Sequence, residues 1–331
     1  MTYAIRIISL LLIASQILGA NPATASELRL EQVGENHHFE HQGEGRQNSL
    51  TIYQVGDDHT LHSEVNGTGN QLYIDQVGTN NSTSVTLTGQ HNDISVSQGQ
   101  SSINDIPGSD STVAISVTGN DNGVEIQQTI GNLLSTEDNA EVTIRGNENK
   151  VYVDQKRWRT NANIDISGDD NEVTSRQTSG GDLSVAIQGN DNQATFNDLW
   201  NTTVDASVSG HLNTINARIN FGQSLLQQYG NGNSMHIDSE HSNLHATQRG
   251  NNNQMNLIDQ NESILFSHNT DVRTFEQNGN SNQMDYWGHV KPVSLSQTGN
   301  ENTMYINNAA GQFTNITASQ VGNGHVVLVN Q

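Results

Sequence analysis

Side-chain amides recur along this chain at a fixed spacing. In segment 70–76, an asparagine and a glutamine stand six positions apart, and aliphatic residues occupy the positions two and four after the asparagine. The same Asn-x5-Gln spacing pairs Asn48 with Gln54, Asn70 with Gln76, Asn92 with Gln98, Asn122 with Gln128, Asn149 with Gln155, and Asn171 with Gln177, and in all but the last pair the positions two and four after the asparagine are both aliphatic. Each amide carries donors and an acceptor, so identical amides stacked about 4.8 Å apart can bond along a column. The pattern therefore indicates self-association through hydrogen bonds.

Glycine residues punctuate the amide pattern. One series, at intervals of eleven residues, comprises Gly34, Gly45, Gly56, Gly67, Gly78 and Gly89, and a later series at about twice that interval comprises Gly146, Gly168, Gly189 and Gly210. Many of them open a Gly-x-x-Asn sequence, and both glycine and asparagine reach positive φ at low cost. The Gly-x-x-Asn pattern therefore predicts tight turns between short strands. A second pattern, Gln-x4-Asn, recurs from Gln76 to Asn81, Gln248 to Asn253, Gln277 to Asn282, and Gln297 to Asn302.

A histidine cluster near the start is a candidate for metal chemistry. His37 and His41 would share one face of a strand, and His38 lies between them. The simpler interpretation assigns all three to turn and strand positions of a degenerate first repeat, because His37 stands where later repeats carry asparagine. We therefore expect no metal site here.

Carboxylates in the predicted turns are a second candidate for metal binding. The residues are Asp57 and Asp58, Asp169 and Asp170, and Asp191. The Gly-Gly-x-Gly-x-Asp pattern of calcium-binding solenoids is missing, so we interpret these side chains as solvated turn carboxylates. Neither a metal nor a cofactor is expected.

One basic cluster, Lys-Arg-Trp-Arg at 156–159, follows Gln155. It could contact a polyanion or a cell surface, but a plain exposed turn is the favoured interpretation. A formal net charge of -22 argues against nucleic-acid binding. No serine lies in a nucleophile elbow, there is no cysteine, and acidic residues do not converge. We expect no catalytic residue and no enzymatic activity.

The elements that position these residues are short strands with one apolar face, since apolar and polar residues alternate between the turns. Self-similarity at a fixed period indicates stacked rungs. The predicted fold is all-β: a β-solenoid of strand-turn-strand cross-β rungs, each about 20 to 22 residues, forming one domain over 26–331. Polar interruptions near 99–110, 129–137 and 261–270 predict loop insertions between strands.

Residues 1–25 have the features of a removable export signal: Arg6, an apolar run at 7–18, and Ala-Thr-Ala at 23–25. No later segment is apolar enough for a membrane span, so we expect a secreted mature chain without a transmembrane segment. An apolar content of 32% alone would suggest disorder, but the periodicity favours a fold. The absence of cysteine excludes a disulfide framework.

The Asn-x5-Gln strands and Gln-x4-Asn turns resemble the curlin repeat, and Ser242-x5-Gln248-x4-Asn253 matches most of one unit. The resemblance covers nearly all of 26–331. It implies a curli-type functional amyloid, as fibre subunit or nucleator, on the surface of a Gram-negative bacterium, with roles in adhesion and biofilm matrix. It also implies export through an outer-membrane secretion channel and association with its own copies and other curlin-like subunits.

The chain departs from the curlin pattern in length and in its glutamine column. Curlins typically have five repeats, and this chain is much longer. After about Gly222 the glutamines change to the other strand of each rung, at Gln228, Gln248, Gln277, Gln297 and Gln320. The alternative function is a secreted, monomeric β-solenoid that binds carbohydrate, a surface or ice. Ice binding would need a flat outward column of threonines or aromatics, whereas the outward residues Gln71, Tyr73 and Asp75 are mixed.

Overall fold

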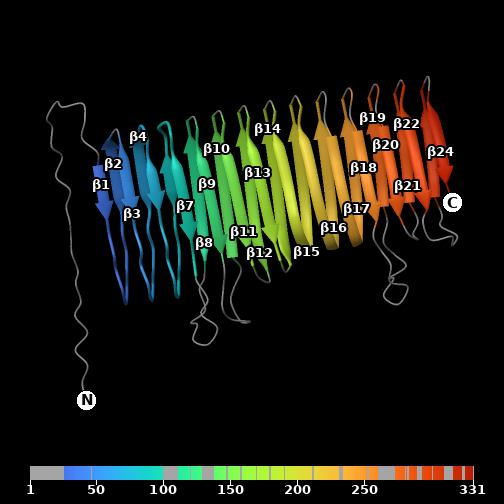
Figure 1. The fold of residues 1–331 in the computed structure, drawn as a ribbon. Coiled ribbons are helices and arrows are strands. Elements are labelled where there is room, and N and C mark those ends of the chain that lie inside the picture. Colours follow the sequence, from blue (N-terminus) through green and yellow to red (C-terminus); the bar gives the residue numbers. More distant parts are fainter. Residues whose placement is uncertain are drawn as a thin grey trace, which may run out of the picture.

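The computed structural model is a long stack of short β-strands, with β1 at one end and β24 at the other (Figure 1). It describes residues 26–45, 47–99, 111–119, 121–128, 138–146, 148–156, 159–168, 170–178, 180–189, 191–210, 212–230, 234–250, 252, 254–259, 273–279, 281, 283–288, 293–299, 301–308, 316–322 and 325–330. Every element in these ranges is a strand, and all 24 strands pair in parallel. The predicted all-β solenoid is confirmed.

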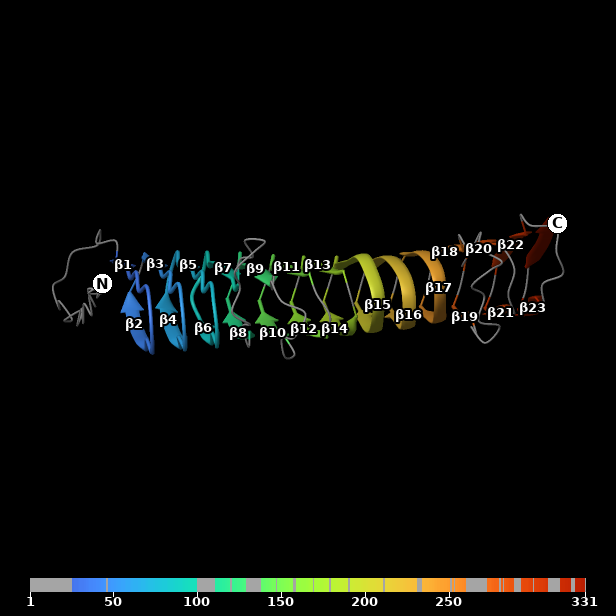
Figure 2. The ribbon, with the colours of Figure 1, turned by 90° about the horizontal axis from the view of Figure 1, so that it is seen from below.

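The strands form two walls that face each other (Figure 2). The first wall contains β1 (Ser26–Arg29), β3 (Asn48–Thr51), β5 (Gln71–Tyr73), β7 (Asp93–Ser97), β9 (Gly123–Gln128), β11 (Lys150–Gln155), β13 (Glu172–Gln177), β18 (Gln254–Asp259), β20 (Gln283–Gly288), β22 (Thr303–Asn308) and β24 (Val326–Asn330). The second wall contains β2 (His41–Gly45), β4 (Ser63–Gly67), β6 (Val85–Leu87), β8 (Thr112–Thr118), β10 (Asp138–Arg145), β12 (Thr160–Ser167), β14 (Gly181–Gln188), β19 (Arg273–Asn278), β21 (Val293–Thr298) and β23 (Ile316–Val321).

Three long strands belong to both walls: β15 (Gln193–Ser209), β16 (Thr214–Tyr229) and β17 (Ser234–Arg249). The corner in β15 uses positive φ at Asp198 (51°) and Asn201 (53°), and the corner in β16 uses Phe221 (58°) and Gly222 (142°). Sequence reasoning predicted separate strands here. The two walls join as one strand because single residues in the left-handed region turn the chain sharply without a loop.

The walls meet at two edges that differ in their turns. At the glycine edge, a Gly-x-x-Asn turn leads from the second wall back to the first, as from Gly168 to Asn171. At the far edge the chain passes from the first wall to the second. The predicted insertions at 99–110, 129–137 and 261–270 each join a first-wall strand to a second-wall strand. These insertions, apart from Gly99, and the predicted signal at 1–25 lie outside the described residues.

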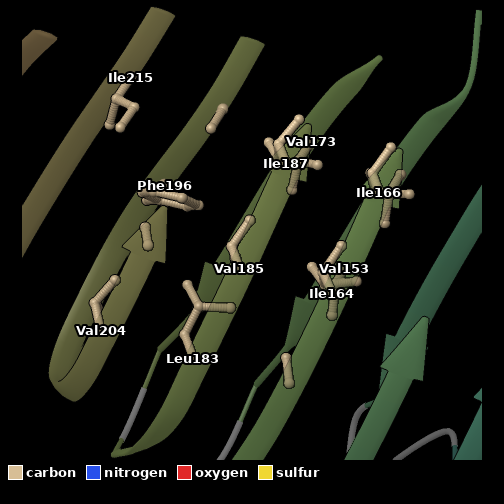
Figure 3. Packing of buried hydrophobic residues seen from close by; sticks show 14 of the residues in the cluster. Val153, Ile164, Ile166, Val173, Leu183, Val185, Ile187, Phe196, Val204 and Ile215 are labelled. Carbon is tan, nitrogen blue, oxygen red and sulfur yellow. The ribbon is translucent and has the colours of Figure 1, made fainter. Parts of the chain in front are cut away.

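The apolar core consists of columns between the two walls. Leu50 aligns with Leu72, and Val151 aligns with Val124 and Val173, all of them buried. Figure 3 shows side chains from both walls, such as Val153 and Ile164, that belong to this single cluster. Because each core residue packs on its equivalents one rung away, a chain of low apolar content still closes a dry core. No helix in the described ranges is long and apolar enough to cross a bilayer.

Strand phase gives a direct test of this arrangement. Ile74 is fully buried, whereas its neighbour Tyr73 lies on the outer face. Ile74→Asp is expected to lower the free energy of unfolding by about 3 kcal/mol or more, because the carboxylate would be buried without a partner. The matched outward change Tyr73→Ser should cost about 1 kcal/mol or less. Equal losses in urea denaturation would contradict the inward and outward assignment.

Candidate functional site: polar columns at the two edges

A ladder of glutamine amides runs along the far edge, inside the core. Gln32 Nε2 donates to Gln54 Oε1 at 2.8 Å, Gln54 Nε2 to Gln76 Oε1 at 2.6 Å, and Gln76 Nε2 to Gln98 Oε1 at 2.6 Å. Further along, Gln177 donates to Gln155 at 2.7 Å and Gln155 to Gln128 at 2.6 Å. Gln54 through Gln177 are all buried. The ladder exists because alternation places each glutamine inward and the parallel register places it above its equivalent.

The ladder reverses its direction at Ser111. Between Gln32 and Gln98 every amide donates toward the C-terminal rung, whereas Gln155 and Gln177 donate toward the N-terminal rung. The buried Ser111 hydroxyl accepts from Gln98 Nε2 at 2.7 Å and from Gln128 Nε2 at 3.0 Å. A hydroxyl oxygen has two lone pairs and can accept both bonds. Ser111 therefore joins two parts of the ladder whose amides donate in opposite directions.

The glutamine column then changes edges. The ladder stops after Gln177, and apolar Leu199 and Ile219 follow in the next two rungs. The second wall carries Val208 at its glycine-edge end, and the register aligns this position with Gln228, Gln248, Gln277, Gln297 and Gln320. The change of strand predicted from sequence is therefore present in the register.

Three glutamines of this second set form hydrogen bonds with backbone groups at the glycine edge. Gln228 Nε2 donates to the backbone oxygens of Asn213 at 2.5 Å and Ser234 at 3.2 Å. With its amide oriented to satisfy both partners, Gln248 bonds to the backbone N–H and C=O of Gln254 at 2.9 and 3.2 Å. Gln277 bonds in the same way to Gln283 at 3.1 and 3.3 Å. These amides join a strand to the strand after its turn.

Asparagines form a column at the glycine edge. Asn149 Nδ2 and Asn171 Nδ2 donate to the carbonyl oxygens of Gly146 and Gly168, both at 2.8 Å. Asn70, Asn92 and Asn122 do the same to Gly67, Gly89 and Gly119, at 3.2, 2.8 and 2.7 Å. In the later rungs the amide oxygen accepts from the backbone one rung earlier: Asn171 Oδ1 accepts from Asn149 N at 3.3 Å, Asn192 Oδ1 from Asn171 N at 3.2 Å, and Asn213 Oδ1 from Asn192 N at 3.1 Å. The asparagines of this column from Asn70 to Asn171 thus close their own turns, and Asn171, Asn192 and Asn213 bond to the preceding rung.

Glycines stack beside this asparagine column. A Cβ added to Gly168 would overlap the carbonyl oxygen of Gly146, and one on Gly146 would overlap that of Gly119. Both glycines also have φ near 140° (145° and 141°), where L side chains are strained. On the far edge, a Cβ on Gly56 would find its nearest atom, Val33 O, at 3.5 Å. Glycine is therefore sterically required at Gly146 and Gly168, whereas the space around Gly56 would accept a side chain.

The far edge of the first rungs uses histidine in place of asparagine. The buried His37 and His59 rings stack with centroids 5.3 Å apart, and His59 Nδ1 lies 2.8 Å from Asn81 Oδ1. Burial lowers the pKa of His59, and the hydrogen bond to Asn81 opposes that shift. His41 points toward Ser63, at 3.3 Å, and burial also lowers its pKa. His38 is exposed.

Turn carboxylates form a row on the outer surface of the glycine edge. Asp121, Glu148, Asp170 and Asp191 all occupy left-handed positions, with φ of 57–58°. A hydrogen bond with Asp121, and then the charge of Asp121, raise the pKa of Glu148. Asp121 also pairs with His91 Nδ1 at 3.1 Å. Four acidic side chains on neighbouring rungs repel one another, although solvent screens the repulsion.

The other acidic and basic candidates have structural contacts. Asp57 and Asp58 tie the first two far-edge turns together, accepting from Glu35 N and Asn36 Nδ2, both at 2.7 Å. Lys156 Nζ pairs with Asp154 at 3.1 Å. Among the described side chains, no group of three histidines, aspartates or glutamates could hold a metal ion. Asp169, Arg157 and Trp158 lie outside the described residues.

The described asparagines and glutamines of the predicted columns lie inside the solenoid. They are buried, except for the half-buried Gln320, while Asn253 and Asn282 lie outside the described residues. Gly45, Gly67, Gly89, Gly146, Gly168, Gly189 and Gly210 lie at the glycine edge, and Gly56 and Gly78 lie at the far edge. Sequence reasoning missed Asn192 and Asn213, which continue the asparagine column, and Ser111. The Gly-x-x-Asn pattern would have identified the two asparagines, since each follows a glycine by three positions.

One inward charge was not expected. Arg273 occupies the core column between Leu244 and Val293 and is 1% exposed. Its Nε donates to the carbonyl oxygen of Ser242 at 3.3 Å. Burial lowers the pKa of Arg273, and the neighbouring Tyr286 counteracts this. Alternation alone placed Arg273 inward, in phase with Phe275 and Gln277.

No protein-family model, curated protein or solved structure matches this chain.

The steric role of the glycine edge predicts an asymmetric response to alanine. Gly168→Ala is expected to lower the free energy of unfolding by about 2 kcal/mol or more, because the new Cβ meets a carbonyl and φ is strained. Gly56→Ala is the matched far-edge control and should change it by less than about 1 kcal/mol. Urea denaturation measures both. A Gly56→Ala loss as large as that of Gly168→Ala would refute the close approach.

The lowered pKa of His59 predicts that acid destabilises the far edge of the first rungs. Its pKa in the fold lies below the ordinary value of 6.5, so the unfolded chain binds the proton more readily. The stability that neutral His59 contributes is complete above pH 6.5 and declines as the pH falls toward the folded value. His59→Asn, which introduces the usual residue of such turns, should therefore make unfolding free energy less sensitive to acid between pH 7 and pH 5. The exposed His62→Asn is the control, and identical pH profiles for both variants would disprove the effect.

Proposed function

We propose that this protein is a self-associating structural solenoid that acts outside the cell as a curli-like fibre subunit or nucleator, in adhesion and biofilm matrix. The supporting observation is that its core columns reach β24 with one side uncovered. Val327 and Val329 align with the buried Met304 and Ile306, yet they are 41% and 55% exposed. Among the described strands, β24 pairs with β22 alone.

The uncovered edge offers what another parallel rung would use. Its backbone groups can pair with a further strand, and unpaired strand edges are templates for association. Its valines would be buried, and full burial of one such side chain is worth about 1.5–3 kcal/mol. A rung from another copy, or from a related chain with the same two-wall spacing, provides both kinds of contact. Amide ladders inside each copy would keep the rungs rigid.

One set of experiments tests both fibre formation and the role of the β24 edge in fibre growth. Purified mature chain is expected to form fibres in negative stain, with a cross-β reflection near 4.8 Å. Val327→Lys should slow seeded elongation at least about tenfold, because it buries a charge in the core column. Val326→Lys, the next residue on the same strand, points outward and should elongate like the unmodified chain.

Dye-binding kinetics with preformed seeds give the elongation rates. A chain that stays monomeric at all concentrations would overturn the proposal and favour a monomeric binding module. Equal slowing by the two lysine variants would overturn the assignment of the β24 edge.

A further inference from the structure

A shallow trough crosses the strands of the second wall, close to the far edge. Its first hollow, of about 500 Å³, is formed by β8, β10, β12 and β14, and its second, of about 390 Å³, by β15, β16, β17 and β19. The two hollows are neighbours in register, because Asp182 and Ser184 of the first pair with Thr203 and Asp205 of the second. Eight successive strands at about 4.8 Å make a trough roughly 34 Å long.

Two rows of outward side chains line the trough. One row consists of Thr112, Asn139, Asn161, Asp182, Thr203, Gln223 and Asn243. The other consists of Ala114, Glu141, Asn163, Ser184, Asp205, Leu225, His245 and Thr274. Nearly all are hydroxyls, amides or carboxylates, and neither lysine nor arginine is among the lining residues.

Contacts between rungs orient the amides of the first row. Asn161 Nδ2 donates to Asn139 Oδ1 at 3.0 Å, and Asp182 N donates to Asn161 Oδ1 at 3.3 Å. Small residues line the first hollow: Ala114 faces outward on its first strand, and the buried Ala140 and Ala162 lie on the next two strands. The result is an ordered series of hydrogen-bonding groups, one set per rung.

The first wall is different. Long charged side chains pair across its outer face: Lys150 with Glu172 at 3.6 Å, Arg176 with Asp198 at 3.4 Å, and Arg218 with Asp238 at 3.5 Å. Both hollows described above lie on the second wall, whereas these ion pairs lie on the first.

We propose that this trough binds a linear, uncharged polysaccharide that lies along the solenoid axis. A pyranose ring with its linkage has nearly the length of one rung, so successive hydroxyl groups would meet successive sets of amides and carboxylates. Carboxylates and amides are strong partners for hydroxyl groups. Glu141, Asp182 and Asp205 make an anionic polymer unfavourable.

A peptide fits this surface less well. The backbone groups of the trough strands are committed to ladders with both neighbours, so strand addition is not available on the wall. An extended peptide also repeats its side chains on one face about every 6.7 Å, which does not match the rung spacing. Polysaccharide binding does not depend on the proposed fibre function, since the trough lies within one chain.

Calorimetric titration of monomeric mature chain tests the inference, with cellohexaose and chitohexaose as uncharged probes. At least one hexaose is expected to bind, with a Kd at least about tenfold lower than that of its disaccharide, because several rungs contribute. An alginate oligosaccharide, which is anionic, should not bind. Absence of binding by both hexaoses at millimolar concentration, or equal binding of alginate, would overturn the proposal.

Matched lysine variants locate the binding surface. Asn161→Lys and Gln223→Lys each place a long side chain in one hollow and should weaken hexaose binding at least about fivefold. Asn256→Lys makes the same change as Asn161→Lys on an outward position of the first wall and should change the Kd less than twofold. Equal weakening by Asn256→Lys would place binding elsewhere and refute the trough. Dye-binding assays on the same variants report fibre formation separately.

Discussion

The close approach of successive rungs at the glycine edge is the constraint on which the rest of this solenoid depends. From Gly119 to Gly250, the glycine of each turn at this edge packs against the carbonyl of the glycine one rung earlier or the residue beside it, and its backbone has a conformation that side chains disfavour. A slip of one residue would bring a side chain into that contact. The glycine column therefore sets the register of both walls, and the register in turn aligns the apolar columns and amides.

The two edges differ in how closely their turns pack and in whether they accept insertions. The glycine edge is tight, and asparagine side chains close its turns through most of the first half. The far edge has room at Gly56, although Gly181 and Gly222 lie close to backbone carbonyls there, and each of the three predicted insertions occurs on that side. Surface loops of greater length add little closure entropy, so they are tolerated there. Where an insertion ends, Ser111 restores the continuity of the hydrogen bonds.

Charge is kept mainly at the turns and outer faces, and the core is largely neutral. The amides hydrogen-bond within the core without carrying charge, which avoids the cost of burying ions. Most acidic residues contribute to a net charge of -22 without entering the core columns. In the proposed association, this charge would make copies repel one another until salt screens it. Arg273, His37 and His59 are ionisable residues that are nevertheless buried. Burial lowers the pKa of Arg273 and of His59, which favours their neutral forms.

The sequence by itself determined the period, the two-wall solenoid and the inward phase of each strand. Alternation and regular turns are local signals, so Ile74 and Gln76 could be placed inward from their neighbours alone. The change of the glutamine column after Gly222 was also readable, because it only requires counting from each turn.

Tertiary structure decided what depends on contacts between rungs about twenty residues apart. It distinguishes the glycines that are sterically required from those that are not, although both fall on one eleven-residue beat. It sets the direction of each amide in the ladder and the reversal at Ser111. It also joins the walls in β15 to β17 and hollows one outer face. These features follow from how neighbouring rungs pack. A repeat pattern in the sequence gives the spacing of residues along the chain but not the distances between atoms of neighbouring rungs.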